Sequence, residues 1–238
     1  MAHKFNKTIL REYDIRGIVG NTLTAKDAFF IGKKFSTDIR KQYKNAKIAI
    51  GYDGRMSSNL LERQLTKGLL QGGAKVNNIG VCPSPMLYYA CKALNCDGAI
   101  MITGSHNPPD YNGFKILSRE QSYYGKKIID LAKTEVSKHP ISGGEYKYYD
   151  IAYSYILELT KNLNKINSKV KVVWDPGNGS TCEILNKLIK VIPGKHKVIN
   201  ANIDGTFPSH HPDPTVEENL LELKKNSFTN KIRRWYSF

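Results

Sequence analysis

The sequence predicts an α/β fold with two α/β domains, each built on a mostly parallel mixed sheet, of which the second is incomplete. Short apolar runs of strand length alternate along the chain with segments whose apolar residues recur at helical spacing. This alternation occurs twice, on either side of an aperiodic stretch at residues 139–149. Strands that alternate with helices form parallel sheets with right-handed crossovers, so each half of the chain is expected to fold as one layered domain.

The first predicted domain covers residues 1–138. Thr24 and Asp27 form a capping-box pattern, in which each side chain satisfies a backbone N–H at the start of a helix. Gly72 and Gly73 follow an apolar stripe of helical period and are expected to end that helix, because glycine adopts the left-handed conformation without strain. The expected strands are residues 47–52, 76–81 and 98–103, and the expected helices begin at Thr24, at Ser58 or Asn59, and at Ser84.

The second predicted domain covers residues 150–225 and follows a linker at residues 139–149. The linker holds a proline, two adjacent glycines and three tyrosines without any period. The second domain repeats the strand–helix alternation but stops early. Its expected elements are a helix at residues 152–163, a strand at residues 170–174, a helix led by a capping box at Ser180 and Glu183, a strand at residues 197–200, and a last helix capped by Thr215 and Glu218.

The composition narrows the classes of partner. The chain has 238 residues, with 36 basic and 21 acidic side chains and a net charge of +15. Such a surplus attracts nucleic acid, acidic membranes or phosphorylated small molecules, although a lysine-rich solvated surface explains it equally well. The four cysteines form no Cys-x-x-Cys pair and are expected to be reduced thiols. The lack of a signal peptide and of any apolar run near about 18 residues predicts a cytoplasmic protein.

The segment TGSHNPP at residues 103–109 is the strongest candidate for chemistry. It follows the third predicted strand, and catalytic loops lie at the carboxyl ends of parallel strands. Ser105 would present a hydroxyl there, and His106 could exchange a proton or hydrogen-bond a phosphate. A serine hydroxyl is a weak nucleophile without a base or metal nearby. Taken alone, such a segment is more often a polar turn than a site.

Residues 101–117, MITGSHNPPDYNGFKIL, resemble the phosphoserine loop of the α-D-phosphohexomutase family, in particular its bacterial phosphomannomutase/phosphoglucomutase branch. Three further stretches match motifs of this family and occur in the family's order. They are REYDIRG at residues 11–17, GYDGR at residues 51–55, and the pair DGTFP and HHPDP at residues 204–208 and 210–214. The resemblance runs from about Phe5 to about Lys225 and covers the first half of the family's four-domain protein.

The resemblance implies an isomerase that interconverts the 1-phosphate and 6-phosphate of a hexose, mannose or glucose. In the family a phosphoserine donates its phosphoryl group, and a 1,6-bisphosphate turns over in the site and returns the other one. By this resemblance Ser105 carries the phosphoryl group, while Arg16 and Lys115 are catalytic cations that face it. His106 is a catalytic residue with two open roles, as a hydrogen-bond partner of the phosphate or serine and as a general base.

The resemblance also assigns substrate or phosphate binding to Tyr13, Arg55 and Asn107. For Arg55 a structural salt bridge is as good an interpretation as a role in orienting the loop. Tyr13, with its neighbour Asp14, could instead only fix the backbone of Arg16. Two other motifs are expected to be structural: DPGNGS at residues 175–180 as a tight turn rather than a phosphate cradle, and HH at residues 210–211 as part of a loop rather than a zinc site.

The family binds Mg²⁺ through the phosphoserine and three aspartates of a DGDGD loop, and it uses an activator of the glucose 1,6-bisphosphate type. The sequence has Ser105 as a metal ligand but no such loop, so we expect this chain alone to bind Mg²⁺ weakly. Residues 226–238 hold no acidic residue and no strand alternation. We therefore expect an aberrant tail there, after a frameshift or premature stop, and a second domain without its last strand.

These expectations combine into one hypothesis. The chain is a truncated or split mutase for a hexose phosphate that is inactive alone; if it is split, a separately encoded C-terminal half is its partner. The alternatives are an inactive fragment and a basic nucleic-acid-binding module, which is supported by the net charge and by the basic and aromatic residues at 233–236. No membrane partner is expected.

Overall fold

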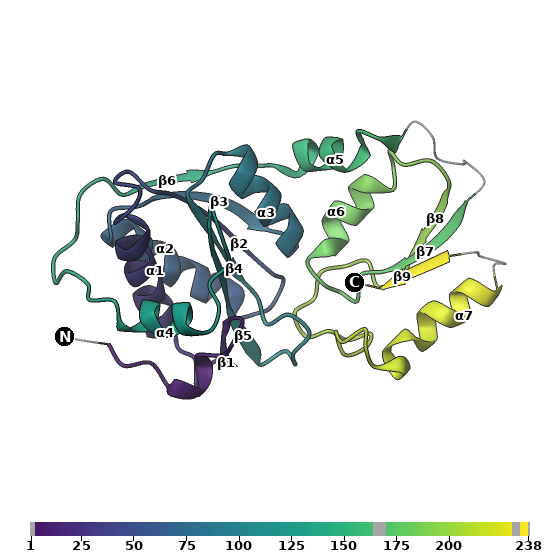
Figure 1. Cartoon of the computed structure of the whole chain (residues 1–238). Coiled ribbons are helices and arrows are strands. Elements are labelled where there is room, and N and C mark those ends of the chain that lie inside the picture. The colour runs from purple at the N-terminus through teal and green to yellow at the C-terminus, as the bar shows by residue number, and fades with distance from the viewer. Residues whose placement is uncertain (1–2, 164–169, 230–233, 238) are drawn as a thin grey trace. The chain divides into compact units, whose positions relative to one another are not determined.

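The computed structural model describes residues 3–163, 170–229 and 234–237 of the chain (Figure 1). The chain divides into two compact units. One consists of Met1–Gly104 and Asp110–Asp150, and the other of Ser105–Pro109 and Ile151–Phe238. Each unit contains helices and a sheet, which confirms the predicted α/β fold class. Within the described ranges, no helix combines the length and the apolar character that a membrane crossing requires.

The first unit is built on a six-stranded mixed sheet with the strand order β1-β5-β4-β2-β3-β6. Strands β4, β2, β3 and β6 run parallel to one another, whereas β5 is antiparallel to both β4 and β1. The mostly parallel mixed sheet predicted from the sequence is therefore confirmed. The bounds are β1 (Ile15–Ile18), β2 (Lys47–Tyr52), β3 (Lys75–Val81), β4 (Gly98–Ile102), β5 (Tyr111–Ser118) and β6 (Glu145–Tyr148).

Three helices of the first unit begin where the sequence signals place them, whereas the helix at Lys126–Lys133 and the 3-10 helix at Lys7–Ile9 were not predicted. In the capping box, the Asp27 N–H donates to the Thr24 hydroxyl at 3.2 Å and the Thr24 N–H donates to the Asp27 carboxylate at 2.7 Å. Gly73, with φ = 79°, follows the end of α2 as predicted. The bounds are α1 (Ala25–Ile39), α2 (Ser58–Gln71), α3 (Ser84–Ala93) and α4 (Lys126–Lys133), with a 3-10 helix η1 (Lys7–Ile9) ahead of β1.

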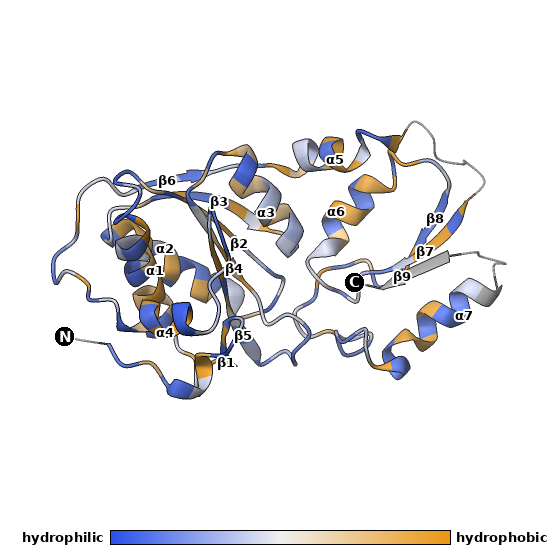
Figure 2. Cartoon of the chain, in the orientation of Figure 1, coloured by the Kyte–Doolittle hydropathy of each residue, from blue (hydrophilic) through white to orange (hydrophobic). Residues whose placement is uncertain are grey.

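Helices α1 and α2 pack closely because each presents a glycine to the other. A Cβ atom on Gly68 would lie 2.0 Å from the Phe29 carbonyl oxygen, and one on Gly32 would lie 2.3 Å from that of Leu65. Figure 2 shows apolar residues alternating with hydrophilic ones along both helices. The apolar ones, such as the fully buried Phe35, join the core beside the sheet. Strands β2 and β4 contribute isoleucines to the same core, and they lead into the loops described below.

Strand β6 lies within the stretch that was expected to be a linker. Its residues Glu145–Tyr148 pair in parallel with the start of β3, so this part of the stretch belongs to the first sheet. It is an edge strand, and Tyr146 and Tyr148 are exposed. An edge strand with exposed side chains needs no apolar alternation, and for that reason periodicity did not indicate it.

The second unit contains a parallel three-stranded sheet with the order β8-β7-β9. The predicted helix at 152, the strand near 171 and the helix after 180 are confirmed, while the predicted strand at 197–200 begins two residues earlier, at Lys195. The bounds are α5 (Ala152–Thr160), β7 (Lys171–Asp175), α6 (Thr181–Leu188), β8 (Lys195–Val198), a 3-10 helix η3 (Glu217–Leu220), α7 (Leu221–Thr229) and β9 (Arg234–Ser237).

The expectation that the second domain lacks its last strand is wrong. The backbone of Arg234–Ser237 pairs in parallel with Val172–Asp175 of β7, and β7 becomes the central strand of the sheet. A parallel ladder is formed by backbone N–H and C=O groups. The absence of alternating apolar side chains in the tail was therefore a poor criterion for excluding a strand there.

Two predicted helix caps in this unit are also wrong. Ser180 precedes α6 with helical backbone angles and makes no side-chain capping bond. Thr215 instead donates its hydroxyl and its N–H to the carboxylate of Asp213, at 2.7 and 2.9 Å. This local turn competes with a helix start, as expected for aspartate and threonine. The last α-helix consequently begins only at Leu221, after the 3-10 helix.

Candidate active site

The loop that carries Ser105 connects β4 to β5. Thr103, which follows β4, donates its N–H to the Gly113 carbonyl oxygen at 3.0 Å and extends the antiparallel pairing of these strands. Ser105 has φ = 55°, in the left-handed region that few residues other than glycine adopt. Backbone strain of this kind is stored at functional turns where the surroundings impose it. The conformation of Ser105 is therefore a feature that this loop shares with functional turns, and it supports the loop as a candidate site.

The carboxylate of Asp53 fixes the start of this loop. Its Oδ2 accepts the backbone N–H of Gly104 at 3.2 Å, and its Oδ1 accepts the Ser58 hydroxyl at 2.6 Å. Its own backbone N–H donates to the Ile102 carbonyl oxygen at 2.9 Å. The turn after β2 is thus hydrogen-bonded to Ile102, the last residue of β4, and to Gly104, two residues further along. Sequence reasoning did not single out Asp53, although it is the central residue of the GYDGR motif.

Arg55 lies buried beneath Gly104. Its side chain is fully buried, its Nε donates to the Asp53 carboxylate at 3.1 Å, and its Nη1 donates to the Tyr111 carbonyl oxygen at 3.1 Å. A Cβ on Gly104 would lie 2.5 Å from the guanidinium, so glycine is needed there. Burial lowers the pKa of Arg55, Asp53 opposes this, and the positive charge of Arg16 adds to the lowering. Arg55 therefore forms a structural salt bridge and also contacts the backbone at one end of the loop, so both interpretations given for it from the sequence agree with these contacts.

Arg16 and Lys115 lie on one face of the first sheet. Arg16 of β1 stands opposite Gly113 of β5, and Lys115 is two residues further along β5, so both side chains leave the sheet on the same side. The Arg16 guanidinium donates to the Asp14 carboxylate, with its Nε at 3.1 Å, and its side chain keeps 18% exposure. The strand register therefore brings two of the predicted cations together, and Asp14 contacts the side chain of Arg16 rather than only its backbone.

Tyr13 and Lys115 line the same hollow of the first unit, which has a volume of about 320 Å³. Tyr13 is 77% exposed. Other aromatic side chains in the lining are Tyr88, Tyr123 and Tyr124. An exposed phenol ring beside a lysine is suited to contact a polar ligand that approaches the Lys115 ammonium, which agrees with the predicted binding role of Tyr13.

His106 and Asn107 belong to Ser105–Pro109, the segment grouped with the second unit. Within that unit the His106 Nδ1 lies 3.3 Å from the Pro212 carbonyl oxygen. A carbonyl oxygen only accepts, so Nδ1 carries the hydrogen and Nε2 of the neutral ring is the nitrogen that can take up a proton. The ring is exposed, and Asn107 beside it is half-buried. The geometry is compatible with both roles left open for His106.

The segment at residues 175–180 forms a tight turn, as predicted. Gly177 has φ = 53° and donates its N–H to the Asp175 carboxylate at 2.9 Å, while Gly179 donates to the Pro176 carbonyl oxygen at 2.8 Å. The His210 Nε2 lies 3.0 Å from the other oxygen of Asp175. His210 therefore fastens its loop to the end of β7, which supports the structural interpretation of this histidine.

Family models match almost the whole chain. The model described as phosphoglucomutase/phosphomannomutase, alpha/beta/alpha domain I, matches residues 7–139, and the model for domain II of the same proteins matches residues 153–232. The chain belongs to the phosphoglucomutase/phosphomannomutase family. The resemblance inferred from the four sequence motifs is thus confirmed.

Individual family members are similar over most of this chain. A phosphomannomutase/phosphoglucomutase of Pseudomonas aeruginosa is 38% identical over 218 residues, which are 91% of this chain and 46% of that protein. A phosphoglucomutase of Neisseria meningitidis serogroup B is 38% identical over 222 residues, 91% of this chain and 47% of its own length. The crystal structure of a family protein from Burkholderia thailandensis superposes with a TM-score of 0.86 at 34% identity, over 95% of this chain and 51% of that one. The chain spans about half the length of the relatives it matches.

The Mg²⁺ ion that the family implies finds no ligand set among the described residues. No group of three or more histidine, cysteine, aspartate or glutamate side chains there could hold a metal. In the turn after β2, both oxygens of the Asp53 carboxylate accept hydrogen bonds from the protein itself. Octahedral Mg²⁺ needs several carboxylate or phosphate oxygens, so the described residues alone do not fit this ion.

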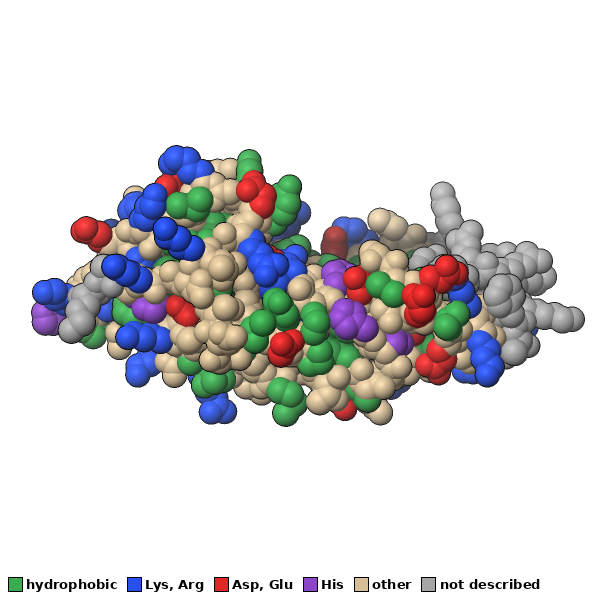
Figure 3. Space-filling model, turned by 90° about the horizontal axis from the view of Figure 1, so that it is seen from below, with side chains coloured by type: hydrophobic (Ala, Val, Ile, Leu, Met, Phe, Trp, Pro, Cys, Tyr) green, Lys and Arg blue, Asp and Glu red, His purple; other side chains and the backbone are tan. Residues whose placement is uncertain are grey.

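On the face of each unit drawn in Figure 3, the basic side chains of this family member form no continuous stripe. Lysine and arginine side chains are scattered there, and acidic ones lie between them. A nucleic-acid backbone is followed by a basic groove or stripe. This face therefore gives no support to the alternative of a nucleic-acid-binding module.

Proposed function

We propose that this chain is the phosphoryl-carrying half of a phosphohexomutase that interconverts the 1-phosphate and 6-phosphate of mannose or glucose. The proposal is carried by the Ser105 loop, a serine with φ = 55° at the carboxyl end of a parallel strand in a chain of this family. The names of the relatives, phosphomannomutase/phosphoglucomutase and phosphoglucomutase, support these two sugars.

In the proposed reaction Ser105 carries a phosphoryl group on Oγ. A free hydroxyl of the hexose phosphate attacks the phosphorus, and the P–Oγ bond breaks. His106 is proposed to accept the hydroxyl proton through Nε2, and the Lys115 ammonium to donate a proton to the departing Oγ. The product is the 1,6-bisphosphate, which turns over in the site. Its other phosphoryl group then returns to Ser105 Oγ, whose proton goes back to Lys115, while His106 returns its proton to the sugar oxygen that is released.

Positive charge is the main requirement of this reaction. A phosphoserine carries about −1.5 to −2 charges at pH 7, and Arg16 and Lys115 supply cations on one face of the sheet. Arg16 offers a planar fork that matches phosphate oxygens, and Lys115 a mobile ammonium. Arg55 holds the loop from below. Correct orientation of this kind supplies roughly 7–11 kcal/mol of a barrier.

Two cofactors belong to the proposal. Mg²⁺, when bound, neutralises charge on the transferring oxygens. The phosphate on Ser105 would be one of its ligands, and the others would come from outside the described residues. A bisphosphate activator such as glucose 1,6-bisphosphate would charge Ser105 with its first phosphoryl group.

The test is phosphorylation of the chain by glucose 1,6-bisphosphate, with the modified residue located by peptide mass spectrometry. We expect one phosphorylated residue, Ser105, and no label in Ser105→Ala. Ser122→Ala, which changes a serine of the neighbouring hollow, is the matched control and should be labelled like the unmodified chain. Label on another residue, or a labelled Ser105→Ala chain, would contradict the proposal.

We also expect residues 1–238 alone to give no mutase turnover. The relatives are about twice as long, and the described residues supply no Mg²⁺ ligand set. Each 1.36 kcal/mol of lost transition-state binding costs about tenfold in rate, so such losses are large. A coupled assay with glucose 1-phosphate and mannose 1-phosphate, with and without the remaining half of a relative, measures this. Turnover by the chain alone that disappears in Ser105→Ala would show that it is complete in function.

A further inference from the structure

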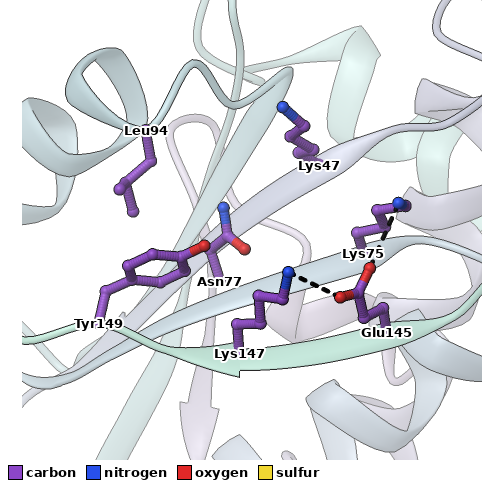
Figure 4. A pocket seen from close by; sticks show the side chains of 7 residues that line it. All are labelled: Lys47, Lys75, Asn77, Leu94, Glu145, Lys147 and Tyr149. Atoms are coloured by element: carbon purple, nitrogen blue, oxygen red, sulfur yellow. Dashed lines mark ion pairs between the residues drawn. The ribbon is translucent and has the colours of Figure 1, made fainter.

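A small polar hollow lies where strands β2, β3 and β6 of the first sheet begin, at the end of the sheet opposite the carboxyl ends of these strands (Figure 4). Its volume is about 160 Å³. Six of its residues are polar: Lys47, Lys75, Asn77, Glu145, Lys147 and Tyr149. β2 leads from this hollow to the turn of Asp53, and a strand of its length spans about 16 Å. The hollow is therefore separate from the Ser105 loop.

Strand register explains why these side chains gather. Lys47, Lys75 and Glu145 form one row across the three parallel strands, because each is the pairing partner of the next. Asn77 and Lys147 form the following row, two residues further along. Side chains two residues apart in a strand point to the same face, so both rows face the same space. Figure 4 shows them around that space, with the Tyr149 hydroxyl turned into it.

The hollow has an excess of positive charge. Three lysines and one glutamate line it. Glu145 is shared, since its oxygens lie 3.3 Å from the Lys75 Nζ and 2.8 Å from the Lys147 Nζ. Among the described residues, no carboxylate lies within ion-pairing distance of the Lys47 ammonium. Lys47 stands directly opposite Lys75, an arrangement of like charges that destabilises a sheet.

Neutral donors complete the lining. Asn77 is buried, and its Nδ2 donates to the Cys96 Sγ at 3.4 Å, which uses one of the two hydrogens of the amide. Tyr149 is held in place because its backbone N–H donates to the Asn78 carbonyl oxygen at 2.9 Å. Ammonium groups, an amide N–H and a phenol hydroxyl all donate, and Glu145 is the one acidic acceptor in the lining. Such a set complements an acceptor-only oxyanion.

We propose that this hollow binds a phosphate group, either as inorganic phosphate or as the phosphate of a monoester. A dianion there would neutralise the two surplus charges, relieve the repulsion between Lys47 and Lys75, and compete with Glu145 for Lys147. The Lys75 and Lys147 side chains are 42% and 57% exposed, so the site is open to solvent and screened by salt. The dissociation constant is consequently of order 1 mM.

The experiment is a titration of the isotopically labelled chain, followed by amide NMR shifts, with inorganic phosphate and separately with glucose 6-phosphate. Chloride at matched ionic strength is the control. We expect phosphate, but not chloride, to move the amides of Leu94 and Tyr149 in a saturable way. Binding of inorganic phosphate alone would identify a free-phosphate site, and equal binding of the monoester would identify a site for its phosphate group. The amides of Gly104 and Gly113 report the Ser105 region separately, so failure of either site is seen independently.

Charge variants test the assignment. The double variant Lys47→Gln/Lys147→Gln should weaken binding at Tyr149 about tenfold. Lys41→Gln/Lys126→Gln, which removes two exposed lysines paired with Asp38 and Asp130, should leave it unchanged.

Glu145→Gln should tighten phosphate binding, because it frees two ammonium groups, whereas Glu158→Gln on α5 should not. Because the expected effects of the lysine and glutamate variants have opposite signs, a folding defect cannot imitate both. Absence of a saturable phosphate response at Tyr149, or a response that survives Lys47→Gln/Lys147→Gln in a folded chain, would overturn the proposal.

Discussion

The Gly104 N–H donates to the Asp53 carboxylate at 3.2 Å, and this contact joins the turn after β2 to the residue that precedes Ser105. The same carboxylate accepts from the buried Arg55 guanidinium at 3.1 Å. Arg55 in turn reaches the Tyr111 carbonyl oxygen, at the far end of the loop. One buried ion pair therefore holds the loop at both of its ends.

Removal of the Asp53 charge should be strongly destabilising. Asp53→Asn leaves the fully buried Arg55 guanidinium without its carboxylate, and breaking a buried pair in this way costs about 3–5 kcal/mol. Urea unfolding of the two chains measures the difference. Asp130→Asn, which breaks an exposed pair with Lys126, is the control and should change stability by about 0.5 kcal/mol or less. Equal effects of the two substitutions would show that the buried pair does not hold the loop.

The chain with glycine at position 105 should be more stable than the chain with alanine there. Its φ of 55° costs an L-residue about 1–2 kcal/mol, which glycine does not incur. We therefore expect Ser105→Gly to unfold at higher urea than Ser105→Ala, although neither accepts a phosphoryl group. Ser118 of β5 is the control, because glycine in a strand is less stable than alanine and the order should reverse there. The same order at both positions would mean that the strained loop conformation is not kept in solution.

The sequence predicted those parts of the fold that apolar periodicity marks. The bounds of β2 were predicted to the residue, because all of Ile48 to Gly51 is buried and the run is bounded by polar residues. Strand β5 was missed although it lies inside the sheet, between β1 and β4. Asparagine is typical of turns, but the Asn112 side chain of β5 is buried. Its amide donates hydrogen bonds to the hydroxyls of Ser57 and Ser58 at 2.9 and 3.0 Å. A buried polar group whose partners are distant in sequence has no local signal.

The candidate site was likewise predictable only in part, because some of its contacts join residues that are distant in sequence. The motifs identified Ser105, Arg16 and Lys115, and the register of β1 with β5 places the two cations on one face. The roles of Asp53 and Arg55 depend on contacts between the turn after β2 and the loop after β4. Such contacts between adjacent strand ends follow from strand order, which periodicity does not give. Residue type alone therefore could not separate a phosphate-binding arginine from a buried one.

The thiols should be unreactive in the folded chain. Burial raises the pKa of Cys82 and Cys91 to about 12 and that of Cys182 to about 11, and it also raises that of Cys96. At pH 8 the thiolate fraction of a group with a pKa near 12 is about one in ten thousand, and the thiolate is the reactive form. Ellman's reagent should label all four cysteines rapidly in urea and slowly in the native state. Rapid native labelling of Cys82 would contradict its burial.

The contact between His210 and Asp175 should contribute more to stability than the position of His210 in a loop suggests. Asp175 is fully buried, and its Oδ1 accepts from Gly177 at 2.9 Å and from Asn200 at 3.1 Å. Among the described contacts, His210 is the donor to the other oxygen, Oδ2. His210→Ala therefore leaves half of a buried carboxylate without a hydrogen-bond donor, at a cost of about 1–3 kcal/mol.

Three further variants separate this contact from a general effect of the loop. His211→Ala alters an exposed neighbour and should unfold like the unmodified chain in urea at the same pH. His210→Gln keeps a donor and should recover part of the loss. In the double variant Asp175→Asn/His210→Ala the second substitution should add less than it does alone, because residues in contact are not additive. Full additivity of the two substitutions would mean that the 3.0 Å contact contributes nothing to the stability of the loop.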